Sequence, residues 1–136
     1  MNVQNKVVAR FMDGRVVKGT TVDFLPTRPS FHLLPIGQTG TTIAVIEIQV
    51  SDLKALFFVK DFIGDATYDE AKAFNEGTPT HGRRMQVVFR DDEMLVGTTT
   101  GYQPERSGFF LVPADPRSNN DRCFIVAAAV KGVKFL

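Results

Sequence analysis

Residues 8–35 read VARFMDGRVVKGTTVDFLPTRPSFHLLP, and residues 86–113 read QVVFRDDEMLVGTTTGYQPERSGFFLVP. The two stretches align without a gap, and ten of the twenty-eight aligned positions are identical. The identities include Gly19 with Gly97 and the loop arginines of the two stretches. So many identities in one order indicate a duplication. The chain is therefore expected to contain two copies of one small β module.

Each copy carries the pattern of a strand-rich module. In the first copy, β-branched and aromatic residues flank Asp13-Gly14, which is typical of a tight hairpin turn. Gly19 lies within the next strand and predicts a bend or bulge that curls this strand toward a barrel. Strands are expected at residues 7–11, 15–24, 31–34, 43–50 and 54–59, and again at 85–89, 93–102, 109–112, 123–126 and 130–136.

The segment between the copies has a different character. A capping box of the form Thr-x-x-Glu begins at Thr67, helix-favouring residues follow it, and a glycine and a proline then give a stop signal. A short helix is expected at about residues 68–76. The predicted division is a first barrel at residues 1–62, a connecting segment at 63–82 and a second barrel at 83–136.

The repeat resembles the first motif of the Sm-like proteins, which here runs from Val8 through Asp13-Gly14 and Gly19 to Phe24. The resemblance implies an all-β fold, mainly β with one short helix, built of two tandem five-stranded barrels of the Sm-like or SH3-like type. Sm-like proteins have an Asn-rich loop that reads RNA bases, where this chain has PTRPS and PERSG. Their RNA-binding residues are therefore not carried over.

Along nearly its whole length, the chain also resembles an uncharacterised bacterial family of tandem small-barrel proteins. The resemblance is carried by FFVKDFIGD, by the expected helix, and by the second copy ending in GFFLVPADPRSNNDRCFIV. It implies the barrel fold and a bacterial cytosolic setting, and it implies no particular chemistry.

The composition limits the classes of function. Of the 136 residues, 43% are hydrophobic and 23% are charged, as in an ordinary globular protein. A net charge of +1 argues against a general attraction to nucleic acid or membranes. The single cysteine, Cys123, is expected to be a buried apolar residue. No apolar run is long enough to span a bilayer and the first residues lack a signal-peptide centre, so a cytoplasmic location is expected.

No catalytic, metal or cofactor site is expected, and the chain is predicted not to be an enzyme. His32 and His81 have no cysteine or carboxylate at metal-ligand spacing, and no reason exists to bring Cys123 beside either of them. The acidic residues 91–93 form a carboxylate cluster on a hairpin turn. This cluster is either a solvated turn or a weak cation site.

Two features are candidates for binding a partner. Arg28 and Arg106 follow prolines in equivalent loops, where a guanidinium either clamps a carboxylate or phosphate or bonds carbonyls of its own barrel. The polar loop at residues 114–122 is particular to the second copy, and is either a partner surface or a hydrogen-bonded turn. The candidate partner-binding residues are Arg28, Arg106, Phe109, Phe110, Asp115, Arg117, Ser118, Asn119, Asn120 and Arg122.

The leading functional hypothesis is a non-enzymatic adaptor or regulatory module that binds another protein. The alternative is binding of single-stranded nucleic acid or a nucleotide, through the loop arginines and Arg83-Arg84, with Phe31, Tyr102 and Phe110 as stacking residues. A cyclic dinucleotide is included in this alternative, although the Asp/Asn-x-Ser-x-x-Gly segment of PilZ sites does not follow Arg84. The sequence leaves homo-oligomerisation open.

Overall fold

The computed structural model describes residues 4–38, 40, 43–62, 82–115 and 118–136. These residues form ten β-strands and two short 3₁₀ helices, so the all-β prediction is confirmed. The predicted helix at residues 68–76 lies outside the described residues. The elements are β1 (Asn5–Phe11), β2 (Val16–Thr21), β3 (Ser30–Pro35), β4 (Ile46–Gln49), η1 (Val50–Asp52), β5 (Leu53–Val59), β6 (Arg83–Phe89), β7 (Met94–Thr99), β8 (Gly108–Pro113), β9 (Asn120–Val126), η2 (Ala127–Ala129) and β10 (Val130–Phe135).

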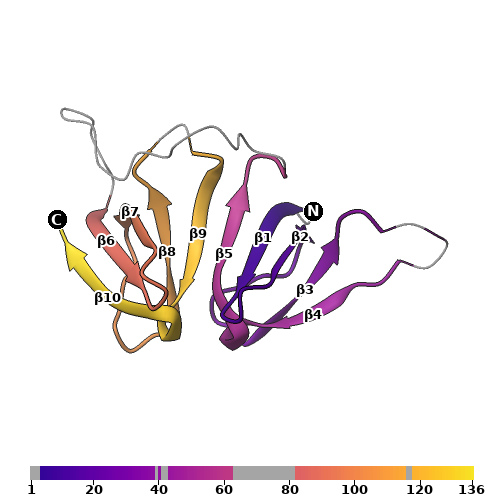
Figure 1. Ribbon diagram of the computed structural model, residues 1–136, viewed down its shortest axis with the longest axis horizontal. Coiled ribbons are helices and arrows are strands. Elements are labelled where there is room, and N and C mark those ends of the chain that lie inside the picture. The colour runs from indigo at the N-terminus through magenta and orange to yellow at the C-terminus, as the bar shows by residue number, and fades with distance from the viewer. Residues whose placement is uncertain (1–3, 39, 41–42, 63–81, 116–117) are drawn as a thin grey trace.

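All ten strands belong to one antiparallel sheet, in the order β10-β6-β7-β8-β9-β5-β1-β2-β3-β4. The first half of the chain (β1 to β5) and the second half (β6 to β10) lie side by side and meet at β5 and β9 (Figure 1). The order β5-β1-β2-β3-β4 of the first half recurs in the second as β10-β6-β7-β8-β9. The strands thus form one sheet rather than two, because β5 pairs with β9.

Gly19 allows two strands to approach closely, and the bulge predicted at this residue is not found. Gly19 stays in register with Val7 on one side and with Pro35 on the other. A Cβ atom on Gly19 would collide with the carbonyl oxygen of Leu34, and one on Gly97 would collide with that of Val112. The backbone of the neighbouring strand therefore requires a glycine at both positions.

The first hairpin turns of the two halves have the same form. The amide of Gly14 donates to the Phe11 carbonyl at 3.1 Å, and that of Asp92 donates to the Phe89 carbonyl at 2.9 Å. Gly14 has a φ of 95° and Asp92 a φ of 70°. An aspartate tolerates this left-handed conformation better than most residues, so the turn survives without glycine.

Two clusters of buried apolar side chains fill the fold, and each cluster contains residues from both halves of the chain. Phe124 and Val126 of β9 belong to the cluster of the first half. Ala55, Phe57 and Val59 of β5 belong to the cluster of the second half. A strand at the junction contributes to both clusters because successive side chains of a strand point to opposite faces of the sheet. Each core is completed by the other half.

The remaining local predictions concern Cys123 and membrane segments. Cys123 is buried, as expected, and its thiol lies 3.6 Å from the carbonyl oxygen of Leu111. In the described part of the chain, no helix combines the length and apolar character that crossing a bilayer requires.

Candidate functional site

The junction between β5 and β9 places side chains from both halves next to one another. The strands pair from Ala55 opposite Ile125 to Phe58 opposite Arg122. Because the two cores continue through this pairing, the junction is held by the same apolar packing as the halves themselves. Two surfaces flank it, one made of charged residues and one of aromatic residues.

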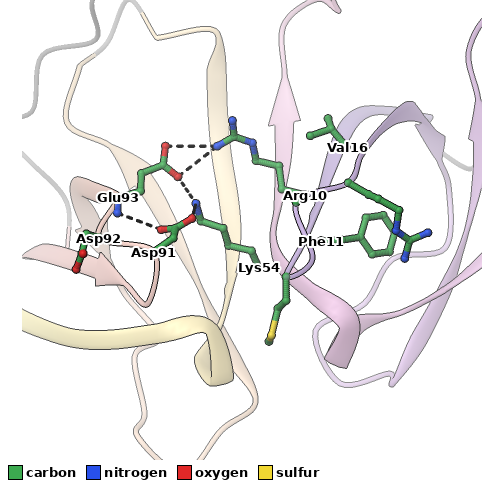
Figure 2. Close-up of a pocket in the computed structure, with 10 residues that line it drawn as sticks. Arg10, Phe11, Val16, Lys54, Asp91, Asp92 and Glu93 are labelled. Carbon is green, nitrogen blue, oxygen red and sulfur yellow. Dashed lines mark hydrogen bonds and ion pairs between the residues drawn. The ribbon is translucent and has the colours of Figure 1, made fainter.

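The charged surface is a network of ion pairs that crosses the junction (Figure 2). Lys54 of β5 donates from Nζ to Asp91 Oδ2 at 2.7 Å, and it also bonds Glu93. Arg10 of β1 donates from Nη1 to Glu93 Oε1 at 3.2 Å. The two cations come from the first half and the two carboxylates from the hairpin turn of the second half, so the network ties the halves together.

Lys54 is at the centre of this network because it bonds both Asp91 and Glu93. Its side chain is only 11% exposed. Its ammonium group also lies 4.7 Å from the centroid of the Phe89 ring, a favourable cation–π contact. The hydrogen bond from Lys54, followed by one from the backbone amide of Glu93, holds the pKa of the Asp91 carboxyl below its usual value. Both contacts favour the charged form of the carboxylate.

The network borders a cavity of about 550 Å³, whose charges are paired within the protein. Asp92 bonds Lys131 at 3.0 Å, so each carboxylate of residues 91–93 has a basic partner. Pairing of this kind argues against the weak cation site considered for these carboxylates. Among the described residues, no group of three His, Cys, Asp or Glu is placed to hold a metal ion. The cavity is lined by Arg10, Phe11, Met12, Gly14, Arg15, Val16, Lys54, Asp91, Asp92 and Glu93.

The aromatic surface is a second cavity, of about 430 Å³, which we term the aromatic pocket. Its apolar wall consists of Phe109, Phe110 and Phe124, of which Phe110 is partly exposed. Loops of both halves border it, so it lies at the junction and belongs to neither half alone. Its lining residues are Pro26, Thr27, Thr100, Gly101, Arg106, Ser107, Gly108, Phe109, Phe110 and Phe124.

The loop arginines end two equivalent turns. The amide of Arg28 donates to the Leu25 carbonyl, and that of Arg106 to the Gln103 carbonyl, both at 3.1 Å. A proline occupies the second position of each turn, where its fixed φ is favourable. Arg106 also donates from Nε to Gln103 Oε1 at 2.7 Å. Arg106 lines the aromatic pocket and Arg28 does not, so the two arginines do not converge there.

Arg122 packs across the junction against Phe110, which lines the aromatic pocket. Its guanidinium carbon lies 4.4 Å from the ring centroid of Phe58 on β5 and 4.7 Å from that of Phe110 on β8. Phe110 also meets Phe124 edge-on, with ring centroids 5.2 Å apart. The candidate residues Phe110 and Arg122 thus belong to one stack that supports the pocket wall.

The polar loop at residues 114–122 is bonded into the protein. Asp115 and Ser118 are buried, and the Ser118 hydroxyl accepts a hydrogen bond from the Asn120 amide at 3.0 Å. The side-chain amide of Asn119 donates to the Asp61 carbonyl at 2.9 Å and accepts from its amide at 3.2 Å. The loop therefore anchors the chain that follows β5, as a hydrogen-bonded turn does. Arg117 lies outside the described residues.

Asn119 and Asn120 also line a hollow of about 380 Å³ beside Arg10 and Glu93.

Sequence reasoning did not single out Arg10 or Lys54. A signal was present, because Arg10 aligns with Val88 and Glu93 aligns with Arg15. Arg10 and Glu93 thus differ from the residues aligned with them, whereas Lys54 aligns with Lys131 and carries no such signal.

The aromatic residues predicted to stack on nucleic-acid bases are largely packed against other side chains of the protein. Phe31 is buried at 1% exposure. The Tyr102 ring meets Phe109 edge-on at 5.0 Å and Phe135 at 5.6 Å. Arg83 lies 3.6 Å over the ring of Phe135, on the far side of the second half from the junction. These residues therefore do not form one exposed stacking platform.

Residues 3–136 match a Family of unknown function (DUF6982). No curated protein and no solved structure matches the chain.

Proposed function

We propose that this chain, which belongs to the Family of unknown function (DUF6982), is a non-enzymatic adaptor or regulatory module that binds a partner protein in the aromatic pocket. One observation carries the proposal. The loops of both halves meet around a cavity of about 430 Å³ whose wall is aromatic and whose edge bears the exposed Arg106. Its size lies within the usual range of ligand pockets.

The chemistry of the pocket indicates the kind of segment that it accepts. The partly exposed ring of Phe110, backed by the buried rings of Phe109 and Phe124, offers an apolar contact to one side chain of the partner. The guanidinium of Arg106 offers a charge-assisted hydrogen bond to a carboxylate. The expected partner segment therefore carries an apolar side chain next to an aspartate or glutamate.

The pairing of charges at the junction supports binding rather than catalysis. Arg10, Lys54, Asp91 and Glu93 bond one another, so none of them stands alone in a cleft as a general acid or base would. Protein binding is also favoured over nucleic-acid binding. Only Arg106 of the four arginines considered for phosphate contact lines the aromatic pocket, and a phosphate backbone needs several such contacts.

The repeated strand order supports a finer description of the fold. In this proposal, residues 1–62 and 83–136 are tandem small barrels of the Sm-like or SH3-like type, and residues 63–82 connect them. The matching registers of Gly19 with Pro35 and of Gly97 with Pro113 favour two copies of one module. The proposed setting is the bacterial cytoplasm.

Photo-crosslinking from the rim of the aromatic pocket tests the proposal. A photoreactive amino acid replaces Thr100, which is exposed and lines the pocket, and adducts formed in cells are identified by mass spectrometry. An R106E variant is expected to lower the yield of a specific protein adduct about tenfold, as a loss of 1.4 kcal/mol would. The matched control is R28E, which reverses the aligned arginine outside the pocket and is expected to leave the yield unchanged.

Two results would contradict the proposal. One is the absence of any protein adduct above the level obtained with the crosslinker at an exposed position outside the pocket lining, such as Val22. The other is an equal loss of adduct in R106E and R28E, since a general effect of charge would then explain the binding. An RNA adduct in place of a protein would favour the nucleic-acid alternative.

A further inference from the structure

The sheet ends in two strands that are each paired on one side only. Strand β4 pairs with β3, and strand β10 pairs with β6. Among the described residues, no strand pairs with the other edge of either one. Unpaired edges of this kind offer a row of backbone donors and acceptors to another chain.

The two open strands are the counterparts of the two strands that pair at the junction. Strand β4 holds the place in the first half that β9 holds in the second, and β10 corresponds to β5. The registers agree, since Phe31 faces Ile48 in the first half and Phe109 faces Ile125 in the second. The junction therefore shows how a β10 edge would fit a β4 edge.

We propose that β10 of one molecule pairs with β4 of a second copy of this chain, antiparallel and in the register that joins β5 to β9. Transferring this register places Gly132 opposite Ile48 and Phe135 opposite Val45 of the other copy. Each molecule offers one edge of each kind, so the interface is heterologous and leads to a closed ring or an open filament.

The exposure of apolar residues on β10 supports this partner. Phe58 and Val59 of β5 are 5% and 8% exposed, because β9 and its half cover them. Their counterparts Phe135 and Leu136 are 36% and 57% exposed. The same positions are thus apolar in both halves, and only those at the junction are covered.

The segment before β4 carries the complementary apolar residues. Asn120 and Arg122 of β9 pair with β5 and not with β8. Their counterparts Ile43 and Val45 precede β4, are 63% and 55% exposed and have no strand partner in the described structure. Pairing with β10 would therefore extend β4 from Ile46 back to Ile43.

The side chain of Gln38 already holds this segment in place. Its amide nitrogen donates to the Ala44 carbonyl, and its oxygen accepts from the Ala44 amide, both at 2.9 Å. Neighbouring residues of an extended chain direct their backbone groups to opposite sides. Because the backbone groups of Ala44 bond Gln38, the backbone groups of Ile43 and Val45 are directed to the open edge of the sheet.

The charges favour unlike edges over like edges. Strand β10 carries Lys131 and Lys134, so two β10 edges would bring lysines together. Strand β4 carries Glu47, which lies diagonal to Lys131 of the other copy in the transferred register. Glu47 and Gln49 stand where β9 has Phe124 and Val126, so the interface is more polar than the junction. Association is therefore expected to be reversible and weakened by salt.

Disulfide trapping tests both the partner and the register. The variants V45C and F135C are purified separately with Cys123 retained, since this cysteine is buried. Directly opposed residues of antiparallel strands have Cα atoms about 4.5–5.5 Å apart, which a disulfide can span. Mild oxidation is expected to give a covalent dimer when V45C is mixed with F135C, and at least about tenfold less when either is oxidised alone.

A mixture of V22C with F135C is the matched control, because Val22 is 52% exposed and belongs to neither open edge. Equal dimer yields in this control, or in either single variant, would overturn the proposed register and the head-to-tail contact. Light scattering gives an independent readout with unmodified protein. The mass is expected to rise with concentration and to stay that of a monomer in E47K, whereas a wild-type monomer at every concentration would overturn the proposal.

Discussion

Lys54 Nζ lies 2.7 Å from Asp91 Oδ2, and this ion pair joins β5 of the first half to a hairpin turn of the second. Lysine recurs at the aligned position of the second half, Lys131, which bonds Asp92 of the same turn at 3.0 Å. The side chain of Lys54 is 11% exposed and that of Lys131 is 63% exposed. Aligned residues with similar partners thus lie in different surroundings.

The difference predicts unequal effects on stability. Replacing Lys54 with methionine removes the cation shared by Asp91 and Glu93 and is expected to lower the free energy of unfolding by about 1–2 kcal/mol. The K131M variant should change it by less than about 0.5 kcal/mol, because its ion pair is exposed. Urea denaturation of both variants checks this prediction. Equal effects would contradict the prediction that the buried Lys54 network contributes more to stability than the exposed Lys131 ion pair.

The titration of Asp91 should depend on Lys54. The Lys54 hydrogen bond and then the Glu93 amide hold the pKa of this carboxyl below the usual 3.8. A lowered folded-state pKa stabilises the fold above the unfolded pKa, and the stabilisation is lost as the pH falls through the folded value. In K54M, NMR titration should therefore show a raised Asp91 pKa and a smaller contribution of this residue to acid unfolding.

Asp23 provides the control for this titration. Burial raises the pKa of its carboxyl, but hydrogen bonds from His32 and Thr21 outweigh burial and bring it below the usual value. Asp23 makes no contact with Lys54, so its titration should be the same in the K54M variant. A shift of both carboxyls would indicate a general change of structure.

The close approach at the mid-strand glycines predicts a steric effect. A Cβ atom in G19A or G97A would meet a backbone carbonyl, so each variant should be destabilised by about 1–3 kcal/mol. Gly101 is the control, since a Cβ atom there meets nothing within 4 Å. Thermal unfolding compares the three variants. If G19A unfolded at the same temperature as G101A, the close packing of β2 and β3 would be refuted.

The anchoring role of Asn119 predicts a local effect. The N119A variant loses two hydrogen bonds to the backbone of Asp61 and should lose about 1–2 kcal/mol of stability. Hydrogen exchange at the Asp61 amide should also become faster. The N120A variant, whose side-chain amide does not bond Asp61, should leave that exchange rate unchanged. Unchanged exchange in N119A would mean that other contacts hold the segment.

Much of the local structure follows from the sequence alone. Each of the ten predicted strands is found, with ends shifted by at most three residues. The Asp13-Gly14 turn, the aligned Asp92 turn and the burial of Cys123 also agree with prediction. These features depend on neighbouring residues, because period-two patterning, turn chemistry and apolar character act over short distances along the chain.

The placement of the candidate residues depended on tertiary contacts. The sequence allowed the polar loop to be either a partner surface or a hydrogen-bonded turn, and in the structure Ser118 is buried and Asn119 bonds Asp61. Arg28 and Arg106 look alike in sequence, and Arg106 alone borders the aromatic pocket. A residue type and its spacing indicate which bonds a side chain can make, whereas the distant segment that it meets decides which bonds it does make.

The sequence by itself determined the positions of the strands and the first hairpin turn of each half, while the order of the strands in the sheet came from the tertiary structure. Only the tertiary structure decided that β5 pairs with β9, and hence that Arg10 meets Glu93 and that the cores exchange Phe57 and Phe124. The physical reason is that periodicity marks a strand without choosing the neighbour on its open edge. That choice depends on apolar burial and charge pairing between segments far apart in the chain.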